Sequence, residues 1–402
     1  MGQSRQMSRP LRVAIDAHMV GERETGNETY VVNLIRGLAS LGPQAPATQY
    51  LLYSTHPERL DACGPLPSYF ARRRVAPATS ALRITMGLPA RALADHIDVL
   101  HVTYIAPPAV SAAVVATVHD ISYELYPETF SARDRAILKT LVPRTIRHAQ
   151  TVITVSESSR RDISNYYKVD PEKIRVVYQS IASSYRVLHD RSEVESVMAR
   201  HGITGRYLLA VGNLQPRKNL PRLVRAFAEA KRTGAYDGRL VLVGKSMWRE
   251  SQIFQEIRQH GLENEVIATG YISEDDVVAL YNGADAFIYP SIYEGFGLPP
   301  LEAMACGCPA ITGNTSSLPE VVGSAGIMVD PTSEEELTRA IVTMTSDAQF
   351  RDDCIRLGLE RVQHFSATAA ARDTLDVYYD AADRRHSSDR VRDLKSSTEQ
   401  TS

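Results

Sequence analysis

The sequence of 402 residues lacks any apolar run long enough to cross a membrane, since no stretch of 18 apolar residues occurs in it. Residues 1–8 are polar, and the apolar stretch that follows, 11–20, is interrupted by Arg12 and Asp16. That pattern predicts a β-strand and argues against a secretion signal. We therefore expect a cytoplasmic protein, at most peripheral on the inner face of the plasma membrane.

Cysteine is scarce, and its spacing matches neither a zinc site nor a redox pair. The four cysteines are Cys63, Cys306, Cys308 and Cys354. We expect them to be reduced thiols. The acidic run 274–276 could suggest a metal, but it follows Ser273, and a serine before three carboxylates is typical of a capped helix N-terminus.

The sequence also lacks a large excess of either charge, because 45 Lys and Arg residues stand against 47 Asp and Glu residues, a net charge of −2. This balance gives no sign of a nucleic-acid partner. The charges are unevenly placed, however. Residues 1–180 carry 21 cations against 16 anions, and the remainder carries 24 against 31. The first half can therefore face an anionic membrane surface.

Short β-rich runs alternate with helical patterns along both halves of the chain. Runs such as Y-L-L-A-V and A-F-I-Y are apolar on both faces, which is typical of parallel sheets built from βαβ units. We predict an α/β protein with two doubly wound, Rossmann-like domains, whose ligands bind at the carboxyl ends of the strands. The predicted segments are a first domain 1–183, a second domain 184–365, a final helix 366–383 and a disordered tail 384–402 with almost no apolar content.

A nicotinamide-dependent dehydrogenase would use similar domains, but its G-x-G-x-x-G fingerprint is missing. The loop after the first predicted strand has only Gly21 and Gly26, and G-F-G-L-P-P lacks the third glycine. The sequence thus argues against that reaction class.

Residues 294–302 read E-G-F-G-L-P-P-L-E and place two carboxylates on either side of a glycine loop. We predict a buried strand over 286–291, a loop over 292–297 and a helix over 298–307. Prolines suit the first turn of a helix, and the free N–H groups there attract anions such as phosphate. Carboxylates accept hydrogen bonds from hydroxyl groups, so the two glutamates would flank a diphosphate by binding a sugar on one side and a ribose on the other.

A second loop carries cations. V-G-N-L-Q-P-R-K-N, at 211–219, follows a strand and precedes a helix, and its Gly212 and Asn213 come before Arg217 and Lys218. Two adjacent cations at the carboxyl end of a parallel strand suit a diphosphate leaving group, whose charge grows as its bond breaks.

Other strand ends add candidate residues. Those that would complete the donor site in the second half are Lys245, Tyr271 and Ile272. In the first half, T-V-H-D places His119 and Asp120 at the carboxyl edge of a strand, where a histidine beside an aspartate is a candidate for function. Gly26 and Glu28 fill the first strand-to-helix loop, where Gly26 can lie near donor phosphates and Glu28 can contact the acceptor. Tyr104, after D-V-L-H-V-T, is a second acceptor candidate.

Together these segments resemble a known family. E-G-F-G-L-P-P-L-E-A-M-A-C-G-C-P-A-I is similar to the E-x7-E segment of the retaining glycosyltransferases of family 4, which have the GT-B fold. The similarity extends through G-N-L-Q-P-R-K-N into the final helix and covers nearly the whole chain. It implies an inter-domain cleft, a C-terminal helix that crosses back to the first domain, and a nucleotide-sugar donor as co-substrate. It also implies no metal, no other cofactor, and a product that keeps the donor's α configuration.

The resemblance further implies roles for individual residues. Arg217 and Lys218 would contact the diphosphate, Glu302 the ribose hydroxyls, and Glu294 and His119 the transferred hexose. The glycine loop would add donor contacts through Gly295, Phe296 and the amides of Gly297 and Leu298. We assign catalysis to Glu294, His119 and Asp120. Retention can follow either from a double displacement with Glu294 as nucleophile or from same-face attack, in which the leaving phosphate takes the acceptor's proton; we favour the second route.

V-H-D-I-S-Y followed by Y-P-E-T-F looks like the subset of the family that transfers mannose from GDP-mannose to a glycan or lipid-linked acceptor. A glucosyl- or N-acetylglucosaminyltransferase that uses a UDP-sugar is the alternative within the family, and a non-catalytic sugar-nucleotide-binding protein is the alternative outside it. The first loop departs from the family, since Glu28 and Thr29 stand where many relatives carry a glycine and an arginine.

Residues 131–150 mix cations with apolar residues at helical spacing. This segment is either an ordinary half-buried helix or, together with A-R-R-R-V at 71–75, a surface that rests on anionic lipid and receives a lipid-linked acceptor.

Overall fold

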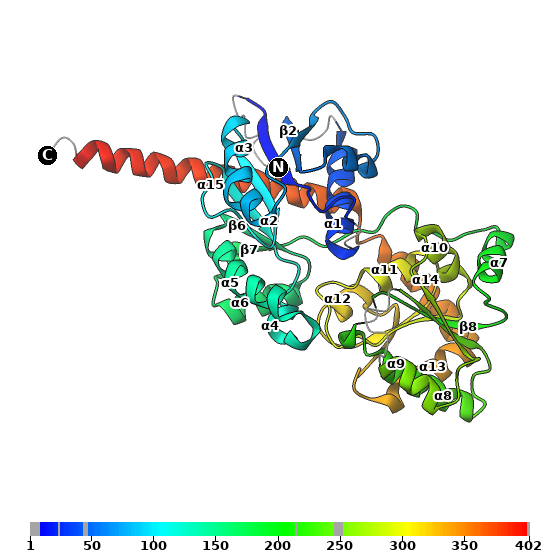
Figure 1. Ribbon diagram of the computed structural model, residues 1–402. Helices are drawn as coiled ribbons and strands as arrows, with labels where there is room; N and C mark the ends of the chain where they lie inside the picture. The colour runs from blue at the N-terminus through cyan, green and yellow to red at the C-terminus, as the bar shows by residue number, and fades with distance from the viewer. Residues whose placement is uncertain (1–8, 23–24, 43–46, 214, 245–251, 400–402) are drawn as a thin grey trace. The chain divides into compact units, whose positions relative to one another are not determined.

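The structure is a computed structural model and describes residues 9–22, 25–42, 47–213, 215–244 and 252–399. The chain divides into two compact units (Figure 1). Unit 1 comprises residues 1–124, 130–180 and 367–402, and unit 2 comprises 125–129 and 181–366. Among the described helices, none is both long enough and apolar enough to cross a bilayer.

Unit 1 is built on a seven-stranded sheet in the order β3-β2-β1-β4-β5-β6-β7, with every neighbouring pair parallel. Its strands are β1 (Leu11–Asp16), β2 (Thr48–Ser54), β3 (Phe70–Arg74), β4 (Val99–Thr103), β5 (Ala113–Thr117), β6 (Thr151–Thr154) and β7 (Ile174–Val176). The strand order reverses between β1 and β4, so the carboxyl ends of these two strands form the switch point at which doubly wound sheets bind ligands.

Helices cover both faces of this sheet because its strands are apolar on both sides. The α-helices are α1 (Thr25–Ser40), α2 (Ser80–Leu82), α3 (Leu88–Ala94), α4 (Ser122–Leu125), α5 (Ala132–His148), α6 (Glu157–Tyr167) and α15 (Ala367–Glu399), and the other helical turns are η2 (Pro57–Cys63), η3 (Arg83–Gly87) and η5 (Pro171–Lys173). The turn η4 (Pro127–Thr129) belongs to unit 2. One core cluster joins Ile35 of α1 and Tyr378 of α15 to the sheet. The other joins Leu88 of α3 and Ile146 of α5 to the opposite face.

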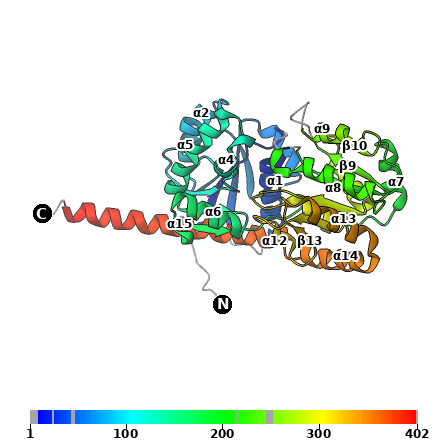
Figure 2. The same cartoon turned by 90° about the horizontal axis from the view of Figure 1, so that it is seen from below.

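The C-terminal helix is longer than the sequence pattern predicts. α15 packs against unit 1 through Ala371, Leu375 and Tyr378, and its C-terminal part runs on beyond the body of the unit in both views (Figures 1 and 2). The prediction of a disordered tail over 384–402 is wrong as far as Glu399, where the helix ends. The physical reason is that residues 366–402 contain neither glycine nor proline, and extending an existing helix is far easier than nucleating one.

Unit 2 is built on a six-stranded parallel sheet in the order β10-β9-β8-β11-β12-β13. Its strands are β8 (Tyr207–Val211), β9 (Arg239–Val243), β10 (Val266–Gly270), β11 (Ala286–Tyr289), β12 (Ala310–Gly313) and β13 (Gly326–Val329). The helices are α7 (Arg191–Arg200), η6 (Pro216–Lys218), α8 (Leu220–Arg232), α9 (Gln252–Gln259), α10 (Glu274–Gly283), α11 (Leu298–Ala305), α12 (Leu318–Val322), α13 (Glu334–Ser346) and α14 (Ala348–Val362). Here the switch point lies between β8 and β11.

The two sheets confirm the predicted pair of doubly wound, Rossmann-like domains. β3 was not predicted from the sequence, because F-A-R-R-R is polar and lies at an edge of the sheet. The interpretation of 274–276 is confirmed, since the Ser273 side chain accepts a hydrogen bond from the Asp276 amide and the three carboxylates form the first turn of α10. All four cysteines are free and buried.

Candidate active site

The predicted donor residues of unit 2 gather at its switch point. The cation loop follows β8 and the glycine loop follows β11, and these two strands are hydrogen-bonded neighbours in the sheet. A backbone hydrogen bond of 2.9 Å from the Ile292 amide to the Arg217 carbonyl oxygen ties one loop to the other. Strand order, and not closeness in sequence, therefore brings the two motifs together.

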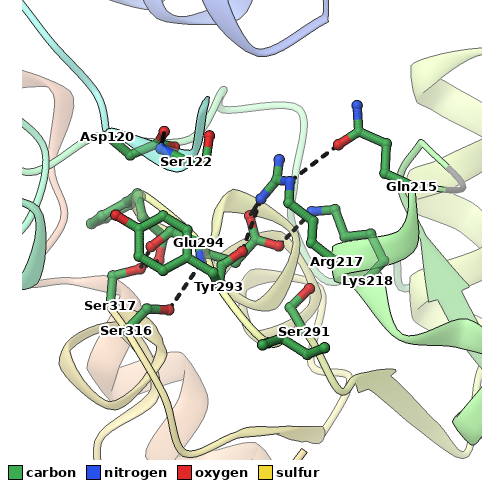
Figure 3. Close-up of polar contacts among 12 residues, drawn as sticks. Asp120, Ser122, Gln215, Arg217, Lys218, Ser291, Tyr293, Glu294, Ser316 and Ser317 are labelled. Carbon is green, nitrogen blue, oxygen red and sulfur yellow. Dashed lines mark hydrogen bonds and ion pairs between the residues drawn. The ribbon is translucent and has the colours of Figure 1, made fainter. Parts of the chain in front are cut away.

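Glu294 is a buried carboxylate between two cations, with only 6% of the residue exposed. Arg217 Nη1 lies 2.8 Å from Oε2, and Lys218 Nζ lies 2.7 Å from Oε1 (Figure 3). The three side chains together carry one net positive charge. Such a cluster can take up a further anion, because its own carboxylate compensates only one of the two cations.

The charge state of Glu294 follows from this pairing. Burial raises the pKa of its carboxyl, but the nearby charges of Arg217 and Lys218 outweigh burial and lower the pKa to about 2. Glu294 is therefore ionised at neutral pH and acts as a fixed negative charge rather than as a proton donor.

Further contacts hold the two cations in place. Arg217 donates from Nη1 to the Tyr293 carbonyl oxygen at 2.9 Å and from Nε to Gln215 Oε1 at 3.1 Å. Lys218 donates to the Tyr289 hydroxyl and lies 4.4 Å from the centre of that ring. The charges at the switch point are thus preorganised, which is the condition for electrostatic stabilisation of a transition state.

Two serines that the sequence analysis missed shape the glycine loop. The Glu294 amide donates to Ser316 Oγ at 2.9 Å, and the Ser317 hydroxyl lies 2.9 Å and 2.6 Å from the carbonyl oxygens of Glu294 and Phe296. Both belong to N-T-S-S-L-P, directly after β12. Small polar residues at the carboxyl end of a parallel strand, before a proline-containing helix, were the signal that could have found them.

Gly297 caps α11 in a left-handed conformation, with φ at 109°. A Cβ added there would lie 2.9 Å from Leu318 Cδ2, and the backbone conformation itself disfavours any other residue. Pro299 and Pro300 carry no N–H, so the amides that remain for an anion at the start of this helix are those of Gly297 and Leu298.

Glu302, the second glutamate of the motif, lies on α11 and is only partly exposed. The Tyr281 hydroxyl donates to Oε2 at 3.2 Å, and the Tyr185 hydroxyl also bonds to this carboxyl group. Burial raises the pKa of Glu302 to about 7. Two carboxylates of one motif therefore differ widely in proton affinity, because Arg217 and Lys218 form ion pairs with Glu294, whereas burial outweighs the weaker effect of Lys218 on Glu302.

The ends of β8, β9 and β10 are glycines with positive φ: Gly212 at 138°, Gly244 at 142° and Gly270 at 71°. A Cβ on Gly244 would lie 2.0 Å from the Gly212 carbonyl oxygen, so these strand ends pack backbone to backbone. Of the other predicted donor residues, Asn213 lies in the loop after β8, Tyr271 is 69% exposed, and Ile272 is buried. Lys245 lies outside the described residues.

In unit 1, His119 follows β5 and is only 8% exposed. Its ring lies 4.6 Å from that of Tyr30 and 5.6 Å from that of Tyr104, measured between centroids. Neither ring nitrogen has a hydrogen-bond partner among the described residues. Burial lowers the pKa of His119 to about 4, so its imidazole is neutral at pH 7. A buried, unpartnered polar side chain at the carboxyl edge of a sheet is a candidate for ligand contact.

Two of the other candidates of unit 1, Asp120 and Glu28, have local hydrogen-bond partners. Asp120 Oδ1 accepts from the Ser122 amide at 2.8 Å and so caps α4. Glu28 Oε1 accepts from the Gly21 amide at 2.7 Å. Gly26 lies in the first turn of α1, and apart from its own helix backbone no heavy atom of the described residues lies within 4 Å of a Cβ built on it. Tyr104 adopts a positive φ of 61°, which is rare for a bulky residue and tends to occur at functional sites.

Comparisons with known proteins identify the family. Residues 195–361 match the family model for Glycosyl transferases group 1, and residues 25–184 match that for Glycosyltransferase Family 4. The chain is 31% identical over 266 residues to O-antigen chain mannosyltransferase B of Escherichia coli, covering 66% of this chain and 69% of that protein.

Two further relatives match smaller shares. O-antigen chain mannosyltransferase RfbU of Salmonella typhimurium is 31% identical over 226 residues, 56% of this chain and 59% of that protein. Serotype-specific mannosyltransferase WbdA of Escherichia coli is 28% identical over 205 residues, 50% of this chain and 25% of that protein. The chain thus spans from a quarter to about two thirds of the length of these relatives.

Solved structures agree on the fold. Sucrose-phosphate synthase from Thermosynechococcus elongatus superposes with a TM-score of 0.71 at 20% identity, covering 92% of this chain and 98% of that one. HepE of Anabaena, solved with UDP and glucose, gives 0.71 at 19% identity, with coverage of 92% and 100%. At these identities the likeness shows the GT-B fold alone. Together with the family models and the 31% identical relative, it leads to one conclusion: the chain belongs to glycosyltransferase family 4 and is a glycosyltransferase.

Proposed function

We propose that the chain transfers mannose from GDP-mannose to a hydroxyl group of a glycan or lipid-linked acceptor, with retention of configuration and without a metal ion. The observation that carries the proposal is the buried cluster of Arg217, Lys218 and Glu294 at the switch point of unit 2. The choice of mannose is supported by the relatives whose names are mannosyltransferases.

In the proposed reaction, the bond between C1 of the hexose and the diphosphate oxygen breaks while the acceptor oxygen bonds to C1 from the same face. The acceptor's proton passes to the leaving diphosphate, and the nucleoside diphosphate departs. Negative charge grows on the diphosphate during bond breaking. Arg217 and Lys218 are cations that would stabilise this charge, since Glu294 compensates only one of them.

Glu294 would contribute as a permanently ionised group. With a pKa of about 2 it accepts hydrogen bonds from hexose hydroxyls, and its charge stabilises positive charge that develops at C1. His119 of unit 1 would form hydrogen bonds with hydroxyl groups of the hexose. Its neutral ring has one nitrogen that donates and one that accepts, and both lack partners among the described residues.

The absence of a metal is part of the proposal, because the two cations can do what a divalent ion does for a leaving diphosphate. The amides of Gly297 and Leu298 would add donors to the phosphate. Glu302 would accept hydrogen bonds from the ribose hydroxyls, which requires its ionised form.

We further propose that unit 1 contacts an anionic membrane surface through α5. The inner side of this helix is buried through Val142 and Ile146, in keeping with an ordinary half-buried helix. Its outer side exposes Arg133, Arg144 and Arg147, to which the described residues offer no acidic partner. The second basic segment contributes less, because β3 is an edge strand whose Arg72 and Arg73 pair with acidic neighbours.

Ligand-induced thermal stabilisation tests the donor assignment. We expect GDP and GDP-mannose to raise the melting temperature in a concentration-dependent way, equally with and without EDTA, because only the folded state binds them. UDP, UDP-glucose and ADP serve as controls. Stabilisation by UDP compounds instead would support the UDP-sugar alternative, loss of the effect in EDTA would contradict the metal-free reaction, and no response to any nucleotide would favour a non-catalytic protein that binds another ligand.

A further inference from the structure

His18 lies at the switch point of unit 1, a position that the proposed reaction has not used. It follows the end of β1 by two residues, and Tyr104 directly follows β4, the neighbouring strand across the switch point. His119 follows β5, the next strand along. Neighbouring strands lie about 4.8 Å apart, so three adjacent strand ends bring these residues to one stretch of the sheet edge about 10 Å wide.

Asp16, the hydrogen-bond partner of His18, forms a buried ion pair with Arg83. Asp16 and Arg83 are 5% and 3% exposed, and Arg83 Nη1 lies 2.8 Å and 2.7 Å from the two carboxylate oxygens. Arg83 begins η3, a single π-helical turn, and such turns occur frequently at functional sites. Removing two charges from water is costly, so a buried pair at a ligand-binding edge calls for a reason other than stability.

The ion pair fixes the orientation of the His18 ring. Asp16 Oδ1 lies 3.1 Å from His18 Nδ1. Burial raises the pKa of Asp16, but His18 and Arg83 outweigh burial and lower the pKa to about 2. An ionised carboxylate can only accept, so Nδ1 of His18 donates to Asp16 and Nε2 is the ring nitrogen left outside this pair.

The remaining nitrogen of His18 is available to a ligand. Asp16 is the hydrogen-bond partner that the described residues give His18, and the side chain is 31% exposed. Two independent features mark the same edge as a binding site. His119 is buried with both nitrogens unpartnered among the described residues, and Tyr104 holds a left-handed backbone conformation.

We propose that His18 is a substrate-binding residue of unit 1, whose Nε2 forms a hydrogen bond with an acceptor hydroxyl, with Asp16 and Arg83 as positioning residues. The inference rests on the proposed function, since it assigns the acceptor of that reaction to this edge. His18 orients the hydroxyl and need not remove its proton, which passes to the leaving diphosphate.

Substitution of His18 tests the assignment through the two Michaelis constants. His18→Phe keeps a flat ring but has no polar atom in it, whereas the amide of His18→Gln can donate to Asp16 and still present an oxygen to the hydroxyl. With GDP-mannose as donor and methyl α-mannoside as acceptor, we expect His18→Phe to raise the KM for the acceptor at least tenfold, with the KM for GDP-mannose within twofold. His18→Gln should recover part of the loss.

His56 provides a matched control, because its Nδ1 also lies 3.1 Å from a carboxylate two residues away, Glu58, on the surface of unit 1. His56→Phe should leave both constants unchanged. Equal changes of both constants in His18→Phe, or an unchanged acceptor KM, would overturn the proposal.

A binding measurement separates this inference from the proposed function. In ¹⁵N-labelled protein, the Nε2 resonance of His18, assigned by its loss in His18→Phe, should shift when methyl α-mannoside is added. This shift does not depend on turnover, so a protein that shows it without using GDP-mannose would contradict the proposed donor and retain the sugar site. An Nε2 resonance unmoved by the sugar would reject the site even in an active enzyme.

Discussion

At the scale of single residues, substitution of Glu294 distinguishes a role in donor binding from a role in catalysis. Replacing it by glutamine keeps the shape and removes the negative charge that lies between Arg217 and Lys218, so the net charge of these three side chains rises from one to two. We expect the kcat of mannosyl transfer to fall by about 100-fold, the scale of losing one preorganised electrostatic contact. GDP should bind at least as tightly as before, because its diphosphate replaces the missing negative charge. Kinetics and calorimetric titration measure the two effects.

A carboxylate elsewhere in unit 2 provides the control for this substitution. Glu256 pairs with Arg225 at 2.5 Å, away from the switch-point loops, and Glu256→Gln should leave both kcat and GDP affinity unchanged. Full activity in Glu294→Gln would remove Glu294 from both retaining routes. Parallel loss of activity and GDP binding would indicate that the residue only maintains the loop.

Glu302 introduces a pH dependence of donor binding. Its pKa of about 7 in the free protein must fall when ribose hydroxyls donate to the carboxylate, so binding releases a proton below pH 7. We expect the Kd of GDP-mannose, whose diphosphate does not titrate in this range, to rise by up to about tenfold per pH unit below 7 and to level off above it. Calorimetric titrations from pH 5.5 to 8.5 measure this. In Glu302→Gln the Kd should be higher and independent of pH. A pH dependence that persists in this variant would assign the titration to another group.

The same two glutamates affect stability in opposite directions. The pKa of Glu302 is raised, so between its ordinary 4.5 and about 7 the folded state binds more protons than the unfolded state, and the free energy of unfolding falls as the pH rises. The pKa of Glu294 is lowered, so its contribution is present above pH 4.5 and is lost as the pH falls toward 2. Glu302→Gln should therefore flatten the stability profile between pH 4.5 and 7, as followed by urea denaturation.

At the scale of elements, α5 carries the membrane proposal. Its outer side exposes three arginines without acidic partners among the described residues, while its inner side is buried in the core of unit 1. Each cation near an anionic bilayer contributes about 1 kcal/mol, so replacing Arg133, Arg144 and Arg147 by alanine should weaken binding to phosphatidylglycerol vesicles about 100-fold at low salt. Co-sedimentation measures the bound fraction, and binding of the unmodified protein should fall as salt is added.

Three arginines of unit 2 provide the control, because they are also exposed but lie on other helices: Arg232, Arg339 and Arg356. Replacing these by alanine should leave vesicle binding unchanged. Equal losses in both triple variants would mean that only overall charge matters, and no binding to anionic vesicles by the unmodified protein would reject a lipid surface as the partner of α5.

At the scale of the whole molecule, each unit has its own hydrophobic core and its own sheet. The donor residues on unit 2 therefore predict that a nucleotide stabilises this unit selectively. At 100 times its Kd, GDP should add about 2.7 kcal/mol to the unfolding free energy of unit 2. Scanning calorimetry should show two transitions, of which only one moves upward with GDP, and Lys218→Ala should abolish the movement. A single transition would show that the units unfold together, and equal shifts of two transitions would show that GDP stabilises both units.

The sequence by itself determined the architecture and the loops that carry the chemistry. Apolar runs of strand length predict parallel sheets because a strand covered by helices on both faces must be apolar on both sides. Gly297 and the prolines that follow it indicate a turn and the start of a helix. The adjacent Arg217 and Lys218 indicate a concentration of positive charge. Both conclusions depend on the chemistry of one short segment alone. Such features lie within one short segment, so no knowledge of distant residues is needed to interpret them.

Only the tertiary structure decided which groups meet. Glu294 and Arg217 are 77 residues apart in sequence, and they pair because β8 and β11 are neighbours in the sheet. Asp120 was predicted to be catalytic, and the fold uses one of its oxygens to cap α4. His18 attracted no attention in the sequence, because its partner is anchored by Arg83, 67 residues after Asp16. The pairing of charges, the burial of side chains and their proton affinity depend on contacts between distant segments. The order of strands in the sheet sets those contacts, and no single segment of the sequence determines that order.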